Sequence, residues 1–431
     1  MKKVALTLAS IAAITAFAPE ASALPVFARQ TGMACSACHF QHFPLLNGFG
    51  RSFKANAFTM IGSQGVVEGE GLSIPDRLNL AGLTSVWAGT QSGDATQPQV
   101  GVPGSGGELS IFYGGKVSDN AGFLSELAAT GTAGAAQTGG AKLVVLYPVA
   151  DMRAGLSAFT TGGQGAAYGL EYLNTGAVDA HKMTDNGQIK QHLNAAYANT
   201  YMGAHGNATG AAVIVDGNWG MASATTWAPA GPGTNAGTQA LTLNYGRAVA
   251  TFDLAGFDSA VGVQTYGGTY CGATPVVCTD YKVNVVDGQL QGEVAGLATG
   301  FYVSYASAPA GTNGKANAFA AGNSTLGGGL ANLSATSLNV AASVEVAKAA
   351  TVHAGARFAT LTDANGATSG IAGSDNAVMI GATYELAMNL SLGVDYTTQS
   401  GSAWDAYRNG AGAGVDKAGK TAATISLYAL F

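Results

Sequence analysis

The sequence predicts an all-β protein, built as a closed antiparallel barrel of about sixteen strands in an outer membrane. Three observations lead to this prediction: a secretory leader, a charge-poor chain without a membrane-spanning apolar run, and long stretches of alternating apolar and polar residues. Charged residues make up 10% of the chain, against about 25% in soluble domains. No apolar run after the leader approaches the roughly 20 residues of a membrane helix. A barrel remains, because only helices and closed barrels satisfy their backbone groups in lipid.

Residues 1–23 are predicted to be a signal peptide. Lys2 and Lys3 precede an uncharged apolar run, and small residues at 21–23 supply the cleavage signal. We expect cleavage before Leu24, which takes the mature chain out of the cytoplasm. The formal net charge of −6 leaves no basic face, so nucleic acid is not an expected partner.

Alternation with a period of two is clearest near the end of the chain. Leu338 and Val340 alternate with Asn339 and Ala341, and residues 351–358 and 389–396 repeat the pattern. A strand between lipid and a wet lumen needs one apolar and one polar face. We therefore assign residues 76–431 to a transmembrane, porin-like barrel.

Short and long connections alternate along this region. Outer-membrane barrels have short periplasmic turns and longer outer loops, so the pattern predicts seven turns, eight loops and both chain ends on the periplasmic side. The last strand ends at Phe431, which resembles the signal that the barrel-assembly machinery reads. Short turns are expected at 119–121, 148–151, 246–248, 347–349 and 385–387, and long loops at 92–106, 308–334, 362–375 and 401–419.

Residues 24–65 form a separate segment, and residues 66–75 are expected to be a linker. The sequence Cys35-Ser-Ala-Cys38-His39 matches the attachment motif of a c-type haem. Each thiol would bond a haem vinyl group, and His39 would be the proximal ligand of the iron. Two alternatives to haem attachment stay open. One is a zinc site, which would need four ligands, and the other is a redox-active cysteine pair.

The sequence alone does not identify the distal ligand of the haem iron. Met33 and His42 lie so close to the motif that reaching the other haem face is hard. Met60 lies about twenty residues after the motif, far enough for the chain to reach the other face of the haem, so it is the favoured candidate. His42 is the alternative. An ordinary core contact explains Met60 equally well.

The haem segment is expected to plug the barrel. About forty residues rarely fold on their own core, and this segment is dense in phenylalanine. A barrel of about sixteen strands leaves a channel wide enough to receive it.

Two further expectations concern the barrel region. Cys271 and Cys278 should form a disulfide in an oxidising compartment. The remaining histidines are expected to be solvated polar groups; they are His181, His192, His205 and His353.

The N-terminal segment resembles a known family. The matching pieces are Phe27-Ala-Arg-Gln-Thr-Gly-Met33, the Cys-Ser-Ala-Cys-His motif, Pro44-Leu-Leu-Asn47 and Phe49-Gly-Arg-Ser-Phe-Lys54. They look like those of the fused monohaem cytochrome–porins of iron-oxidising bacteria, which are outer-membrane iron(II) oxidases. The specific match covers residues 24–60.

The resemblance implies an iron(II)–cytochrome c oxidoreductase with one haem c. Fe(II) would be the donor outside the cell, and a periplasmic c-type cytochrome would be the acceptor. We expect the haem segment in the lumen or on the periplasmic side, with Fe(II) giving its electron to the haem near the outer opening. Two alternatives stay open: a porin with a tethered cytochrome that gates or senses, and the same architecture with another donor, such as reduced sulfur. An open lumen would favour the porin, and a blocked lumen with a redox-active haem would favour the oxidase.

Overall fold

A computed structural model gives the architecture of the chain. It describes residues 25–62, 64–92, 98–129, 136–176, 181–184, 190–204, 206–231, 240–271, 278–312, 315–317, 333–363, 372–409 and 420–431. The predicted signal peptide lies outside these residues.

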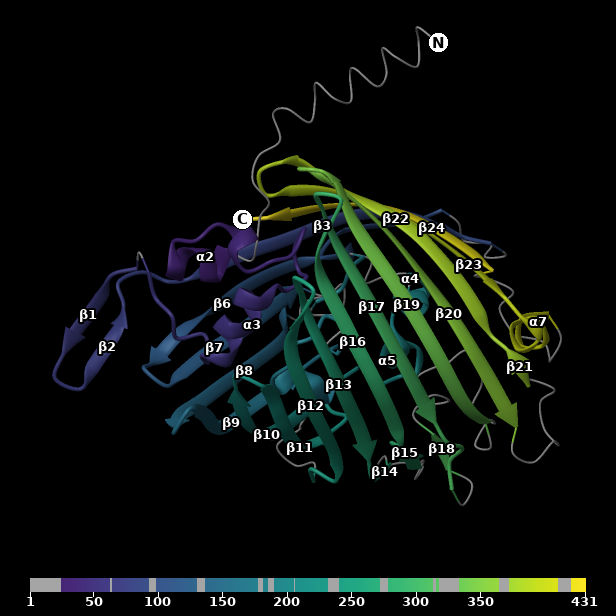
Figure 1. The fold of residues 1–431 in the computed structure, drawn as a ribbon, viewed down its shortest axis with the longest axis horizontal. Helices are drawn as coiled ribbons and strands as arrows, with labels where there is room; N and C mark the ends of the chain where they lie inside the picture. Colours follow the sequence, from purple (N-terminus) through teal and green to yellow (C-terminus); the bar gives the residue numbers. More distant parts are fainter. Residues whose placement is uncertain are drawn as a thin grey trace, which may run out of the picture.

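Sixteen long antiparallel strands of the described chain form a closed barrel, as predicted (Figure 1). The last strand pairs with the first, so that Leu430 lies opposite Leu83. Phe431 and Gly82 exchange backbone hydrogen bonds of 2.9 and 2.6 Å beside this seam. The strands are β3 (Leu80–Gln91), β6 (Leu109–Ser118), β7 (Ala121–Ala129), β8 (Ala136–Val149), β9 (Met152–Thr161), β10 (Ala208–Gly217), β11 (Gly220–Ala228), β12 (Leu243–Leu254), β13 (Phe257–Gly267), β16 (Val283–Val294), β17 (Leu297–Ala308), β19 (Leu333–Ala347), β20 (Ala350–Asp363), β22 (Asn376–Ala387), β23 (Leu390–Ser400) and β24 (Thr421–Leu430).

Shorter strands extend the barrel sheet or form small sheets beside it. The first group is β4 (Gln99–Pro103), β5 (Gly106–Gly107) and β21 (Gly373–Ser374). The second group is the pair β1 (Val66–Gly69) and β2 (Leu72–Pro75), and the three-stranded sheet of β14 (Thr269–Cys271), β15 (Cys278–Asp280) and β18 (Ala316–Asn317).

Seven two-residue turns join the strands at one end of the barrel, and eight longer connections join them at the other. The predicted turns near 119, 150 and 348 are confirmed, and the one at 385–387 is displaced to Met388-Asn389. The predicted turn at 246–248 is wrong, because these residues lie inside β12 and the chain turns at Ala255-Gly256. Both turn residues there have positive φ, +53° and +83°, as the twist of a two-residue hairpin requires.

The two faces of the strands divide as predicted. On β19, Leu338 is 39% exposed on the outer face, whereas its neighbour Asn339 is fully buried on the inner face. On β20, Phe358 points outward and Arg357 inward in the same way. An apolar exterior around a polar interior is typical of barrels that span an outer membrane. Among the described residues, no helix has the length and apolar character needed to cross a membrane.

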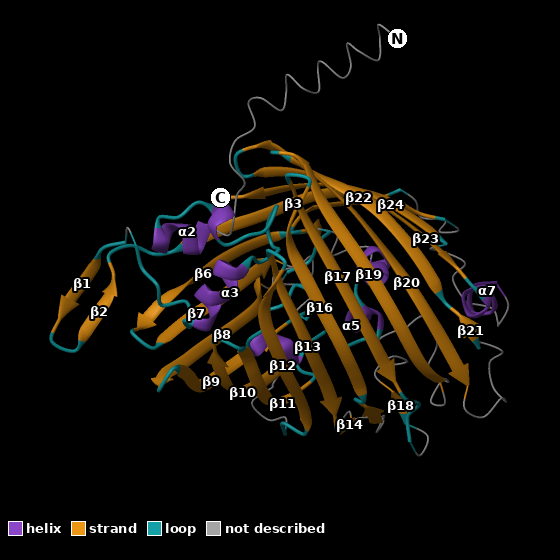
Figure 2. Cartoon of the chain, viewed as in Figure 1, coloured by secondary structure: helices purple, strands orange, loops and turns teal. Residues whose placement is uncertain are grey.

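The interior of the barrel holds two segments of the chain (Figure 2). One is the connection between β9 and β10, of which residues 162–176, 181–184, 190–204, 206 and 207 are described; we call these residues the inner loop. It carries η2 (Ala166–Gly169), α4 (Lys190–Ala196) and α5 (Ala198–Tyr201). Helix α4 contacts strands β19, β20, β22 and β23, and η2 contacts strands β9 to β12 on the other side.

The second interior segment is residues 25–62, which we call the plug. It contains α2 (Pro25–Thr31), η1 (Cys35–Ala37) and α3 (Gly48–Ala55). Its phenylalanines pack together, with ring centroids of Phe27 and Phe53 4.9 Å apart and those of Phe27 and Phe58 5.2 Å apart. This aromatic group joins inward-facing wall residues such as Val144 and Ile214 in one buried cluster. At the other end of the barrel, α7 (Ser402–Asn409) lies among the long connections (Figure 1).

The predicted linker, residues 66–75, is the hairpin β1–β2. Val67 lies opposite Ile74, and Gly69 lies opposite Leu72. The hairpin projects away from the barrel wall beside α2 (Figure 1). It leads directly from the plug into β3.

An arginine on the outer face should destabilise the barrel. Val263 lies in the middle of β13, half-exposed on the outer face opposite Val286. Val263→Arg should lower the free energy of unfolding in lipid vesicles by about 2–4 kcal/mol, the cost of an arginine at the membrane midplane. Val263→Leu is the matched control and should change little. Equal stability of the two variants, measured by denaturant unfolding, would contradict a lipid-facing Val263.

Candidate functional site

The Cys-Ser-Ala-Cys-His motif folds as a single helical turn at the start of the plug. The backbone N–H groups of Cys38 and His39 both donate to the carbonyl of Cys35, at 3.0 and 2.9 Å. Side chains three residues apart in a helical turn lie on one face, so the two thiols share a side. Neither cysteine forms a disulfide in the described part of the chain, and both are partly exposed.

Asn47 holds this turn against helix α3. Its side-chain oxygen caps the helix by accepting from the N–H of Gly50 at 2.9 Å, and its side-chain nitrogen donates to the carbonyl of Ala37 at 3.1 Å. Its backbone N–H donates to the carbonyl of Cys38 at 3.0 Å. A Cβ at position 50 would lie 2.2 Å from that same carbonyl oxygen. Only glycine allows this close approach, so the motif and α3 form one unit.

The hydrogen bonds of His39 fix its ring for ligation. Its Nδ1 lies 3.0 Å from the carbonyl oxygen of Leu45, and because a carbonyl only accepts, Nδ1 carries the proton. The lone pair is then on Nε2, the arrangement seen in ligating histidines. Burial lowers the pKa of His39 to about 4, although its backbone hydrogen bond to Leu45 opposes this. The ring is therefore neutral at physiological pH, as metal ligation requires.

The two cysteines fit haem attachment better than the alternatives. Burial, with a smaller effect of Cys35, raises the pKa of Cys38 to about 11. Redox-active cysteine pairs have a lowered thiol pKa, which is the opposite change. Cys271 and Cys278 are bonded to each other in a disulfide across β14 and β15, so they do not serve as zinc ligands with the motif. Two reduced thiols beside a histidine whose Nε2 carries the lone pair suit a covalently attached haem.

Hydrogen bonds and ion pairs place the plug at the end of the barrel that carries the short turns. Gln41 donates to the carbonyl of Ala298 at 2.8 Å, and Ala298 is the second residue of β17 after a short turn. Arg51 pairs with Asp258, the second residue of β13. Further contacts of the same kind are Arg29 with the carbonyl of Leu80, Arg153 with the carbonyl of Ala55, and Gln41 with Ser343.

These wall contacts locate the plug along the barrel axis. Each lies within about five residues of a short turn or of the start of β3. Short turns mark the periplasmic side of such barrels, so the plug lies in the lumen toward the end with the short turns. The position of a haem relative to the outer opening stays a prediction.

The inner loop clamps the backbone of the plug next to the motif. Asn174 accepts from the N–H of Leu46 at 2.8 Å and donates to the carbonyl of the same residue at 3.1 Å. The N–H of Asn174 donates to the side chain of Gln289 on β16 at 2.8 Å. Leu46 in turn forms an isolated antiparallel β-bridge with His39. The motif is thus linked to the barrel wall through one residue of the inner loop.

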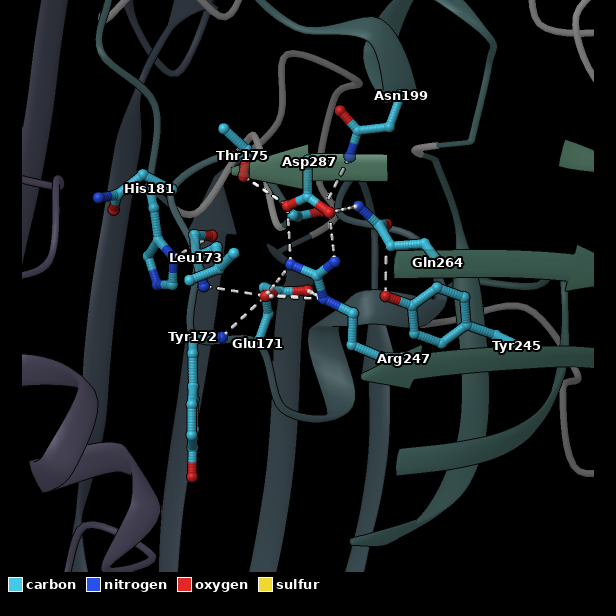
Figure 3. A network of polar contacts seen from close by, with 12 residues as sticks. Glu171, Tyr172, Leu173, Thr175, His181, Asn199, Tyr245, Arg247, Gln264 and Asp287 are labelled. Carbon is cyan, nitrogen blue, oxygen red and sulfur yellow. Dashed lines mark hydrogen bonds and ion pairs between the residues drawn. The ribbon is translucent and has the colours of Figure 1, made fainter. Parts of the chain in front are cut away.

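A buried charge network joins the wall and the inner loop (Figure 3), and a lysine of the plug extends it. Arg247 of β12 makes two bonds to the carboxylate of Asp287 on β16, of 2.5 and 2.8 Å. It also contacts Glu171 of the inner loop at 3.0 Å, and all three side chains are buried. Lys54 of the plug donates to the backbone carbonyl of Glu171 at 2.7 Å and to Nε2 of His181 at 3.0 Å. Removing one charge would leave the others buried without compensation.

The two candidates for the distal ligand, Met60 and His42, lie in different surroundings. Met60 packs with the phenylalanines of the plug. His42 is buried, its Nδ1 lies 2.7 Å from the carbonyl oxygen of Phe43, and its Nε2 has no partner among the described residues. The described residues include no haem iron to which either side chain could be referred, so the distal ligand stays a prediction.

Three other histidines are buried, which corrects the expectation that they are solvated. His353 pairs with Asp395 at 2.7 Å, and His192 contacts Thr397 and Thr424. His181 lies against Lys54, and His205 is outside the described residues. These side chains face the barrel interior, where the inner loop and plug exclude water. Their burial was not visible in the sequence because the covering segments come from elsewhere in the chain.

The fold and the site together define a sixteen-stranded barrel of the outer-membrane type, with its interior occupied by a plug that carries the Cys-Ser-Ala-Cys-His sequence. No protein-family model and no curated protein sequence matches the chain. Among solved structures, OmpT of Vibrio cholerae is 10% identical, covering 85% of this chain and all of that one, with a TM-score of 0.49. A mutant of the Rh. blastica porin is 15% identical, covering 82% and 100%, with a TM-score of 0.44.

The buried amine of Lys54 predicts a change of stability with pH. Burial lowers the pKa of Lys54 from 10.5 to about 8, although Glu171 opposes this. Between these two values the unfolded chain binds the proton and the folded chain does not, so the free energy of unfolding should rise with pH. Lys54→Met should lack this rise, and Lys348→Met, at an exposed turn position, should keep it. Denaturant unfolding at pH values across this window measures the difference. Parallel curves for wild type and Lys54→Met would contradict the buried amine.

Proposed function

We propose that this protein carries electrons through an outer membrane from extracellular Fe(II) to a soluble periplasmic acceptor, using one c-type haem on the plug. The observation that carries the proposal is the placement of His39. Its ring is oriented by Leu45, its Nε2 carries the lone pair, and its segment is fixed inside a closed barrel. The sequence resemblance of residues 24–60 supplies the choice of Fe(II).

The haem, when bound through Cys35 and Cys38, supplies a one-electron redox centre. The chain's own residues position and insulate it. Asn47 keeps the motif turn on α3, and Asn174 fixes the adjacent backbone to the inner loop. Arg51 and Gln41 anchor the plug to the wall. A rigid, dry surrounding is what a protein contributes to a redox cofactor.

The packing of the interior supports electron transfer over bulk diffusion. Inward-facing polar residues of the wall are buried against the plug and the inner loop instead of lining water; Asn339, Gln289 and Arg357 are examples. Asn339 donates to two carbonyls of α4, at 2.9 and 3.0 Å. With the interior occupied in this way, passage of an electron needs no open channel. Fe(II) can be oxidised outside, and the ferric product then forms there.

A porin-type channel is the second candidate, because the barrel itself has the strand number of a porin. It predicts ion conductance in planar bilayers that persists with the plug in place. Electron transfer predicts a low conductance that rises when the plug is released, for example by Arg51→Ala together with Gln41→Ala. Reduced sulfur compounds as donors are tested alongside Fe(II).

The direct test is rapid mixing of haem-loaded protein with Fe(II). Wild-type protein should show the absorbance change of a reduced c-type haem, and cells expressing it should oxidise added Fe(II). His39→Ala should abolish both while heat-dependent gel mobility shows an intact barrel. Met33→Ala, at an exposed position of the plug, is the control and should behave as wild type.

One result would overturn the Fe(II) proposal. Haem-loaded protein that stays oxidised with excess Fe(II) at neutral and acidic pH, but is reduced by dithionite, has a working redox centre and a different donor.

A further inference from the structure

The hairpin β1–β2 has one apolar and one polar face. In an antiparallel pair, residues directly opposite each other share a face. The register therefore puts Val67, Leu72 and Ile74 on one face, and Val66, Glu68, Ser73 and Pro75 on the other. The three apolar side chains are 48–49% exposed.

This apolar face has no cover within the described chain. All four residues of β1 are exposed, as are the first three of β2. An isolated two-stranded hairpin is only marginally stable in water. A hairpin that exposes an apolar face is therefore suited to packing against another surface.

The base of the hairpin is tied to the plug. The N–H of Asp76 donates to the carbonyl of Gly65 at 2.9 Å and closes the base. Gln64 donates to Asn79 at 2.7 Å, and Asn79 donates to Gln30 of α2 at 3.4 Å. These three amide side chains are buried. The hairpin is thus held beside the segment that carries the haem motif.

Charge decides among the possible occupants. Glu68 and Glu70 are the charged residues of the hairpin, and it has no basic side chain. Asp76 and Arg77, which follow the hairpin, pair with each other at 3.3 Å and add no net charge. An acidic surface repels a second copy of itself and an anionic lipid surface, and it attracts a basic protein.

We infer that the apolar face of the β1–β2 hairpin is the docking site for a basic, soluble electron-carrier protein with an apolar contact patch. The inference rests on the proposed function and names the surface where its acceptor binds. Each Fe(II) loses one electron and becomes Fe(III), and the oxidised carrier gains that electron; no bond forms or breaks. The apolar face supplies contact area, and the glutamates supply attraction that salt weakens.

Binding to haem-loaded protein in zwitterionic nanodiscs tests the site. The probe is a lysine-rich soluble c-type cytochrome, and the dissociation constant is measured at low and physiological salt. Val67→Ser with Ile74→Ser should weaken binding by about tenfold or more, as loss of a central apolar contact does. Val66→Ser is the matched control, because it makes the same change on the opposite face, and it should leave binding within about twofold. Glu68→Gln with Glu70→Gln should flatten the salt dependence.

The outcomes separate this inference from the proposed function. Equal binding by the Val67/Ile74 variant, the Val66 variant and wild type would overturn the docking site, whatever Fe(II) does. Hairpin-dependent self-association or binding to anionic vesicles, without binding of the basic cytochrome, would overturn it in favour of another occupant. Fe(II) reduction is measured on the same preparations without the probe. If Fe(II) does not reduce the haem but the cytochrome still binds through the hairpin, the proposal of Fe(II) as donor is overturned and the docking surface stands.

Discussion

The width of the barrel is the constraint on which the rest of the structure depends. Sixteen strands enclose more space than their own inward side chains fill, so the chain supplies two further segments. The plug and the inner loop meet the wall at Arg247, which binds Asp287 of the wall and Glu171 of the inner loop. Lys54 adds the plug to the same network. Because the charges are buried, each needs the others.

The proposed haem site depends on this filling. The motif turn is short, and its geometry is maintained by Asn47 on one side and by the bridge between His39 and Leu46 on the other. Leu46 is held by Asn174, and Asn174 by Gln289 of the wall. The site therefore extends from the barrel wall to the proximal histidine. A segment of this length outside the barrel would lack these supports.

The sequence predicted the features that arise from local patterns. Alternation fixed which residues face lipid, so Leu338 is outside and Asn339 inside. The turn at Ala255-Gly256 was missed because alanine rarely adopts a positive φ, and the Gly246 region looked more like a turn than the true one. The inner loop was missed because its partners are distant in the chain; Glu171 and Arg247 are 76 residues apart. Cysteine and histidine spacing identified the motif, but the burial of His353 depended on covering segments that no local pattern shows.

The central claim is that the N-terminal segment lies inside the barrel at the short-turn end. The side chains of Gln41 and Ser343 are 2.6 Å apart across the boundary between plug and wall. In haem-loaded protein, whose motif thiols are occupied, Gln41→Cys with Ser343→Cys should form a disulfide that mass spectrometry of non-reduced peptides detects. Gln41→Cys paired with Thr362→Cys, at the far end of β20, should not crosslink. No crosslink to position 343, or a crosslink to position 362, would contradict the placement of the plug and the account built on it.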